Sequence, residues 1–236
     1  MRKKSLIFAT VFGAIGIVAC DEGDIYETDG KVQTTGKTVL LTATVTGMDS
    51  WSSKYSVVLA GFNAEGVNIV QKPLPEGTEK AVRTTLELTS DDVARIELCV
   101  TNRLRERVVT FAGMDVTDVQ DDTIRLDAGN VNLGMYQCIQ DLVFTSTCAR
   151  CHGLGNKPAG DLTLVEGQSY AQLVNHVSRV PANGIRVVPG NISASLLHKV
   201  IHGDAGEGVR FDHSNMIKEA TTIALIDNWI TDGAKP

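Results

Sequence analysis

The stretch Cys148-Ala149-Arg150-Cys151-His152 decides how the second half of the chain is interpreted. Two cysteines three residues apart, followed at once by a histidine, have the spacing of a covalent haem attachment. The two thiols can bond two vinyl groups on one porphyrin edge, and the His152 imidazole then ligates the iron. A thioredoxin-like site would need a βαβ context and a zinc site a second ligand pair, and the sequence offers neither. A plain structural disulfide would leave the histidine unexplained. The motif therefore predicts one haem c, with Cys148 and Cys151 as thioethers and His152 as proximal ligand.

The residues around this motif have a helical hydrophobic period. Apolar side chains recur at i, i+3 and i+4 in four segments, at 139–143, 170–177, 196–201 and 223–230. Such spacing is typical of amphipathic helices. We therefore expect a small all-α domain over residues 136–236.

The preceding hundred residues have a different pattern. Thr38–Thr46 is β-branched and partly alternating, which favours a strand. Further strand candidates are 55–62, 67–71, 82–88, 93–101, 107–112 and 123–127. About seven short strands separated by turns predict an antiparallel β-sandwich, immunoglobulin-like, over 37–135. This domain is either a spacer or a binding module, and no cluster of reactive residues distinguishes the two.

The N-terminus has the layout of a secretory signal. Basic residues at positions 2–4 precede an apolar stretch, Leu6–Ala19, that is short for a transmembrane helix. Ile17-Val18-Ala19-Cys20 resembles a bacterial lipobox, which implies cleavage of a signal peptide at 1–19 and lipidation of the Cys20 thiol. A plain signal peptide and an uncleaved anchor are the alternatives.

A polar segment at 20–36 is predicted to be a flexible tether. Its acidic run, Asp21-Glu22-Gly23-Asp24, resembles the surface-export signal of Bacteroidetes lipoproteins. An aspartate directly after the cysteine also resembles the inner-membrane retention signal of enteric bacteria. We expect an exported protein that is lipid-anchored at the outer membrane or cell surface, with the periplasmic face of the inner membrane as the alternative.

Composition limits the classes of function. Hydrophobic residues make up 43% and charged residues 21% of the 236 residues, as in ordinary globular proteins. A formal net charge of −6 argues against a nucleic-acid partner bound through a basic face.

Residues 136–236 resemble the monohaem cytochrome c domains of bacterial lipoproteins and planctomycete-type proteins. The matching pieces are Tyr136-Gln137-Cys138-Ile139-Gln140, Cys148–Gly153, Leu162-Thr163-Leu164, Tyr170, Leu173, Arg186–Asn191, Ser195-Leu196-Leu197 and Ile226–Ala234. The resemblance implies a class I cytochrome c fold in which the first and last helices cross beside the haem. Together the two halves predict an α+β two-domain fold, a β-sandwich followed by an all-α class I cytochrome c domain.

The distal haem ligand is open to two interpretations. The family usually places a Met-Pro pair before the last helix, and here Met216 is followed by Ile217. The resemblance thus favours Met216 as the sixth ligand, and His213 in the same loop is the alternative. His198 and His202 fall opposite the apolar side of their helix, so solvent exposure is expected, although their i, i+4 spacing would also suit a metal.

Four other residues have open roles. By resemblance, the Pro189 carbonyl is a candidate acceptor for the His152 ring, and a turn proline is the alternative. Arg186 either pairs with a haem propionate or is solvated. Cys99 and Cys138 either form an interdomain disulfide or stay separate thiols.

These observations predict a membrane-anchored c-type cytochrome that carries single electrons between redox proteins, either other cytochromes or membrane oxidoreductases. No catalytic acid, base or substrate pocket is apparent, so an enzyme is not expected. A haem-based sensor or peroxidase-like protein with a weak sixth ligand is the second interpretation. The third is a surface adhesion lipoprotein in which the β-domain is the working part.

Overall fold

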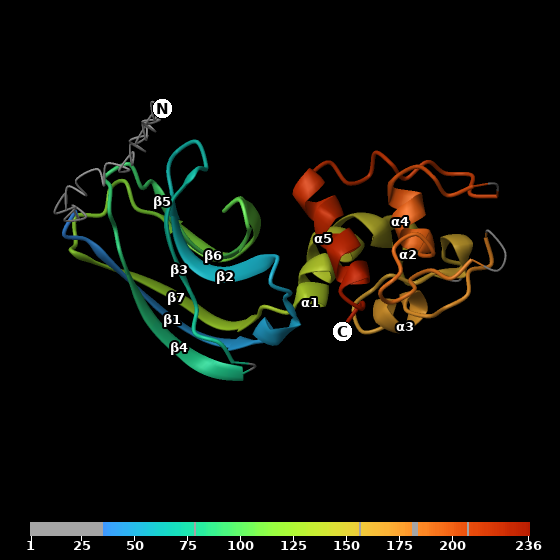
Figure 1. The fold of residues 1–236 in the computed structure, drawn as a ribbon, viewed down its shortest axis with the longest axis horizontal. Helices are drawn as coiled ribbons and strands as arrows, with labels where there is room; N and C mark the ends of the chain where they lie inside the picture. The colour runs from blue at the N-terminus through green and yellow to red at the C-terminus, as the bar shows by residue number, and fades with distance from the viewer. Residues whose placement is uncertain (1–34, 78, 156, 181–183, 207) are drawn as a thin grey trace, which may run out of the picture. The chain divides into compact units, whose positions relative to one another are not determined.

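Seven β-strands form two sheets in the computed structural model (Figure 1). The structure describes residues 35–236 except 78, 156, 181–183 and 207. The predicted signal peptide, the lipidation site Cys20 and nearly all of the tether lie outside these residues. Residues 33–236 group into one compact unit.

The first sheet has the order β4-β1-β7 and the second the order β3-β2-β5-β6. The strands are β1 (Thr38–Thr46), β2 (Tyr55–Phe62), β3 (Asn68–Pro73), β4 (Glu79–Glu87), β5 (Arg95–Asn102), β6 (Arg107–Asp115) and β7 (Thr123–Asn132). A 3-10 helix at Met48–Ser50 joins β1 to β2. Neighbouring strands are antiparallel except β1 and β7, which run parallel.

The two sheets bury apolar side chains at alternate positions. Val39 and Leu41 of β1 belong to the same buried cluster as Leu59 of β2 and Ile96 and Leu98 of β5. This period of two places every second side chain of a strand on the core face. The opposite face of the second sheet buries a smaller cluster of Val58, Ala60, Phe62 and Cys99.

One carboxylate is buried in the second sheet and is fully partnered. Glu97 is 1% exposed and accepts hydrogen bonds from Arg95 Nε (2.9 Å), Arg107 Nη1 (2.6 Å) and Thr110 Oγ1 (2.8 Å). Two cations and a hydroxyl compensate the desolvation of this charge. Arg107 also lies 5.0 Å from the centroid of the Phe62 ring.

Short helices and loops follow the strands. They are α1 (Met135–Ile139), a π-helix (Gln140–Cys148), α2 (Ala149–His152), a 3-10 helix (Ala159–Asp161), α3 (Ser169–Leu173), α4 (Leu196–Ile201) and α5 (Ala220–Thr231). Ile139 and Val143 are buried in one cluster with Ile226 and Ile230 of α5.

The predicted fold class is wrong. We expected an all-α class I cytochrome c domain, whereas the described chain is mostly β, with seven strands and a few short helices. Helices α1 to α4 have five, four, five and six residues. The prediction of wholly antiparallel sheets also fails, at the β1–β7 pair.

The helical period misleads most clearly between residues 170 and 177. Helix α3 ends at Leu173, and Asn175 takes a left-handed φ of 54° that a helix cannot continue. Val174 and Val177 instead form isolated β-bridges with Val187 and Ile185. A short run of four apolar residues does not by itself distinguish a helix from an extended segment, and tertiary pairing decides between them.

Candidate functional site

The backbone at the C-x-x-C-H motif is helical. Cys148 ends the π-helix with φ −76° and ψ −34°, and Cys151 and His152 continue into α2. On helical backbone, residues three apart lie on the same face, so both thiols are directed to one side. The two cysteines are not joined to each other in a disulfide; Cys148 is half-buried and Cys151 is exposed. Burial raises the pKa of the Cys148 thiol to about 11, and the neighbouring Cys151 adds to this effect.

The His152 ring is oriented by a backbone carbonyl. Its Nδ1 lies 2.9 Å from the carbonyl oxygen of Ala159. Because a carbonyl oxygen only accepts, Nδ1 carries the proton and the Nε2 lone pair is free for a metal. Burial lowers the pKa of His152, and the charges of His213 and Arg186 act in the same direction. The imidazole is thus held in its neutral, ligating form, and Ala159 takes the role suggested for Pro189.

Arg186 holds the loop that carries this carbonyl. The side chain is buried, with the residue 3% exposed. Its Nη2 donates to the carbonyls of Asp161 (2.8 Å) and Gly160 (3.3 Å), and its Nη1 to the carbonyl (2.9 Å) and Oε1 (3.0 Å) of Gln172. Gly160 has φ 63°, which a glycine adopts without strain. Both terminal nitrogens of the guanidinium are therefore engaged by protein oxygens, and the group is buried rather than solvated.

A second imidazole lies beside His152. The rings of His152 and His213 have centroids 6.3 Å apart and planes 28° apart, and Phe211 packs 4.9 Å from the His213 ring. The Nδ1 atom of His213 is buried and has no hydrogen-bond partner in the described part of the chain. A buried, unpartnered ring nitrogen is costly unless a ligand compensates it.

Met216 is placed less favourably than His213. Its backbone N–H donates to the carbonyl of His213 at 3.0 Å, but the residue is 37% exposed. The structure thus brings Cys148, Cys151, His152 and His213 together and leaves the Met216 side chain partly in solvent.

The residues at this site fit a haem. The donor set consists of two unpaired thiols, a neutral imidazole with a free Nε2, and a second imidazole with an unpartnered nitrogen. Leu154 and Phe211, close in sequence to the two histidines, are 77% and 59% exposed. Exposed apolar side chains beside polar ligands are typical of a surface that another group covers.

Cys99 and Cys138 form no disulfide. Both are buried free thiols, Cys99 in β5 and Cys138 in α1. Burial raises the pKa of each to about 12, assisted by the nearby carboxylates of Glu97 and Asp141 respectively. The alternative of separate thiols is the one that the structure shows.

A second cluster of ligand atoms was missed by the sequence analysis. His198 Nδ1 lies 2.8 Å from Asp227 Oδ1, and His202 Nε2 lies 2.9 Å from Asp227 Oδ2. The histidine pair was visible in the sequence, but Asp227 is 25 residues beyond His202 and on another helix. No local spacing connects the three.

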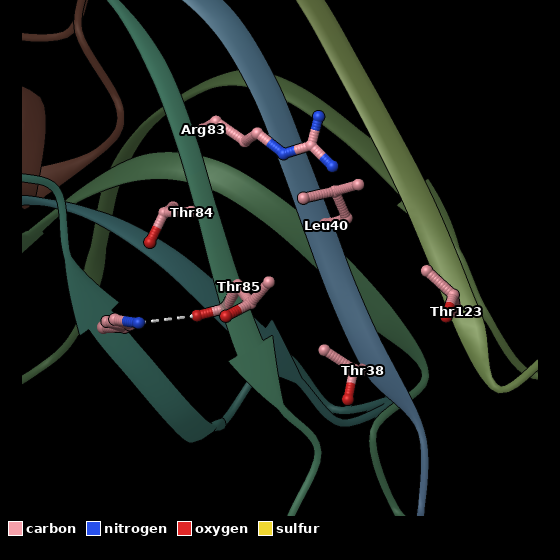
Figure 2. A pocket seen from close by; sticks show the side chains of 7 residues that line it. Thr38, Leu40, Arg83, Thr84, Thr85 and Thr123 are labelled. Atoms are coloured by element: carbon pink, nitrogen blue, oxygen red, sulfur yellow. Dashed lines mark hydrogen bonds between the residues drawn. The ribbon is translucent and has the colours of Figure 1, made fainter.

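A pocket on the first sheet is lined by none of these residues (Figure 2). It is formed mainly by threonines with Leu40, Lys72 and Arg83, and Lys72 Nζ donates to the Thr85 carbonyl at 2.9 Å. Its lining contains no thiol, imidazole or carboxylate.

In residues 35–236, apart from the gaps stated above, no helix has the length and apolar character needed to cross a membrane. In comparisons with known proteins, no family model matches the chain and no curated protein shows a significant match.

Proposed function

We propose that the protein is a c-type cytochrome that carries single electrons between redox proteins, either other cytochromes or membrane oxidoreductases. Cys148 and Cys151 hold one haem covalently, and His152 ligates its iron through Nε2. The observation that carries the proposal is the His152 ring, fixed by Ala159 at 2.9 Å and lying beside a second imidazole whose Nδ1 has no hydrogen-bond partner among the described residues. When bound, the haem supplies a one-electron couple.

We propose His213 as the distal ligand, with Met216 as the alternative. A ring 6.3 Å from His152 with a buried unpartnered nitrogen is better placed than a thioether that is partly in solvent. An imidazole in place of a thioether lowers the reduction potential, because the softer sulfur favours ferrous iron. The protein is thus expected to work at the low-potential end of the c-type range.

The proposed location is the bacterial outer membrane or cell surface, with the periplasmic face of the inner membrane as the alternative. The lipobox-like sequence before Cys20 supports a lipid anchor on that residue. A Cys20→Ser variant should lose the lipid and leave the detergent phase. An unmodified wild-type N-terminus that starts beyond Cys20 would contradict this part of the proposal.

Haem staining after denaturing electrophoresis tests the attachment. Wild-type protein, expressed with the cytochrome c maturation machinery, should keep one haem per chain by stain and intact mass. The double variant C148A/C151A should lose it. The matched control C99A/C138A also removes two cysteines and should retain the haem. Equal staining of C148A/C151A and wild type would refute covalent attachment at this motif.

A haem-based sensor or peroxidase-like protein is the second candidate. The partial exposure of Met216 favours it, since a weakly held sixth position would admit a small ligand. Carbon monoxide separates the two candidates. The electron carrier should show no spectral change on adding the gas to the ferrous protein, whereas a sensor should show one at once.

A further inference from the structure

Two histidines and an aspartate converge between α4 and α5. His198 lies in α4, His202 caps the C-terminus of α4, and Asp227 lies in α5. One ligand atom from each residue lies within 4.8 Å of the other two. Helical spacing of four residues sets the two rings on one face, with centroids 4.3 Å apart.

The side chains are arranged around a single point. The two oxygens of Asp227 each face one ring nitrogen, at 2.8 Å from His198 and 2.9 Å from His202. In a tetrahedral zinc site with bonds of about 2.0–2.1 Å, adjacent ligand atoms are about 3.3 Å apart. On coordination, each histidine–aspartate contact would therefore lengthen by about half an ångström, and the two histidine nitrogens, which lie within 4.8 Å of each other, would move to the same spacing. Hydrogen bonds thus join the same histidine nitrogens and Asp227 oxygens that would coordinate the ion.

The donor set points to one class of ion. Imidazole nitrogens suit zinc, copper, nickel, cobalt and iron, whereas calcium and magnesium require oxygen ligands. Two histidines and one carboxylate leave a fourth position for water, as in open zinc sites. The side chains are 27%, 40% and 21% exposed for His198, His202 and Asp227, so an ion and its water have access from solvent.

We propose that His198, His202 and Asp227 bind one divalent first-row transition-metal ion, with zinc as the reference ion, and that the ion links α4 to α5. This inference does not depend on haem attachment. It assigns the three residues a second, separate metal centre in the same chain.

Isothermal titration calorimetry with Zn²⁺ tests the proposal on the full chain in detergent, after treatment with a chelator. The titration is run in wild type and in a C148S/C151S background, because free thiolates at the motif would themselves bind zinc. In both, we expect one saturable site that depends on the three residues, with a dissociation constant of about 10 µM or lower. D227N and H202Q, each made in the C148S/C151S background, should weaken binding about tenfold or more, the scale on which metal sites respond to changes in their ligand shell.

His176 provides the matched control, because it is exposed and is not one of the three clustered residues. The H176A variant in the same background should bind zinc as tightly as its parent. H202Q is expected to leave the fold intact, because His202 is exposed and glutamine retains a hydrogen-bonding group at this position. Circular dichroism without metal checks that each variant is folded.

Three outcomes would overturn the proposal. The first is the absence of a saturable site tighter than about 100 µM in the C148S/C151S background. The second is less than about a tenfold difference between the parent and both D227N and H202Q. The third is equal affinity for Ca²⁺ and Zn²⁺, which would exclude a nitrogen-based site. The haem stain described above is independent of all three outcomes, so the two proposals fail or stand separately.

Discussion

Replacement of Arg186 by methionine tests how the loop that carries the Ala159 carbonyl is held. The guanidinium makes four hydrogen bonds, of which three go to backbone carbonyls, at Gly160, Asp161 and Gln172. Methionine fills much of the volume but donates nothing. The loop that carries the Ala159 carbonyl then loses the Arg186 hydrogen bonds that link it to Gln172.

The size of the destabilisation in R186M follows from the buried carbonyl oxygens that lose their hydrogen-bond donor. A hydrogen bond from a charged donor contributes about 1.5–3 kcal/mol, and each buried acceptor without a partner costs about 1–3 kcal/mol. Removing a desolvated cation offsets part of this loss. We expect R186M to lower the free energy of unfolding by about 2–4 kcal/mol. For a domain of roughly 200 residues, this corresponds to a melting temperature lower by about 5–15 °C.

Denaturant unfolding followed by circular dichroism measures the effect. Arg179 is the matched control, because its Nε pairs with Asp161 Oδ2 at 3.1 Å from a side chain that is 76% exposed. R179M should cost less than about 0.5 kcal/mol, as surface ion pairs do. A loss below about 1 kcal/mol in R186M, or equal losses in both variants, would refute the assigned role of Arg186.

Three further predictions concern the sheet, the thiols and the iron. E97A should lower the free energy of unfolding in urea by about 1–3 kcal/mol, because it removes the buried acceptor of three hydrogen bonds while both arginines remain partly solvated. Cys99 and Cys138 should resist iodoacetamide at pH 8, where a thiol with a pKa of about 12 is ionised to about one part in ten thousand. Because the pKa of each thiol is raised from 9.0 in the folded protein, the contribution of the two thiols to the free energy of unfolding is complete below about pH 9 and declines as the pH rises toward 12. When melting temperatures are measured against pH, the C99A/C138A variant should lack this decline. With haem bound, H213A should convert the ferric spectrum to high spin and M216A should not; the reverse result would make Met216 the ligand.

The sequence alone located the strands and the C-x-x-C-H motif. The alternating β-branched residues predicted Thr38–Thr46 and Tyr55–Phe62 with the bounds that the structure has. Strand signals of this kind are local, because side chains two apart share a face. The motif at residues 148–152 is equally local, since its chemistry needs neighbouring residues on a helical turn, and the structure provides one there.

The tertiary structure decided which distant groups meet. The Ala159 carbonyl lies against the His152 ring, His213 lies beside that ring, and Asp227 contacts a histidine pair on another helix. The helices are also shorter than the sequence predicted, and the described chain is mostly β. Hydrophobic period reports only that one side of a segment is buried. The partner that buries it is set by packing and by the need to satisfy backbone hydrogen bonds across the whole chain, and no spacing within a segment contains that information.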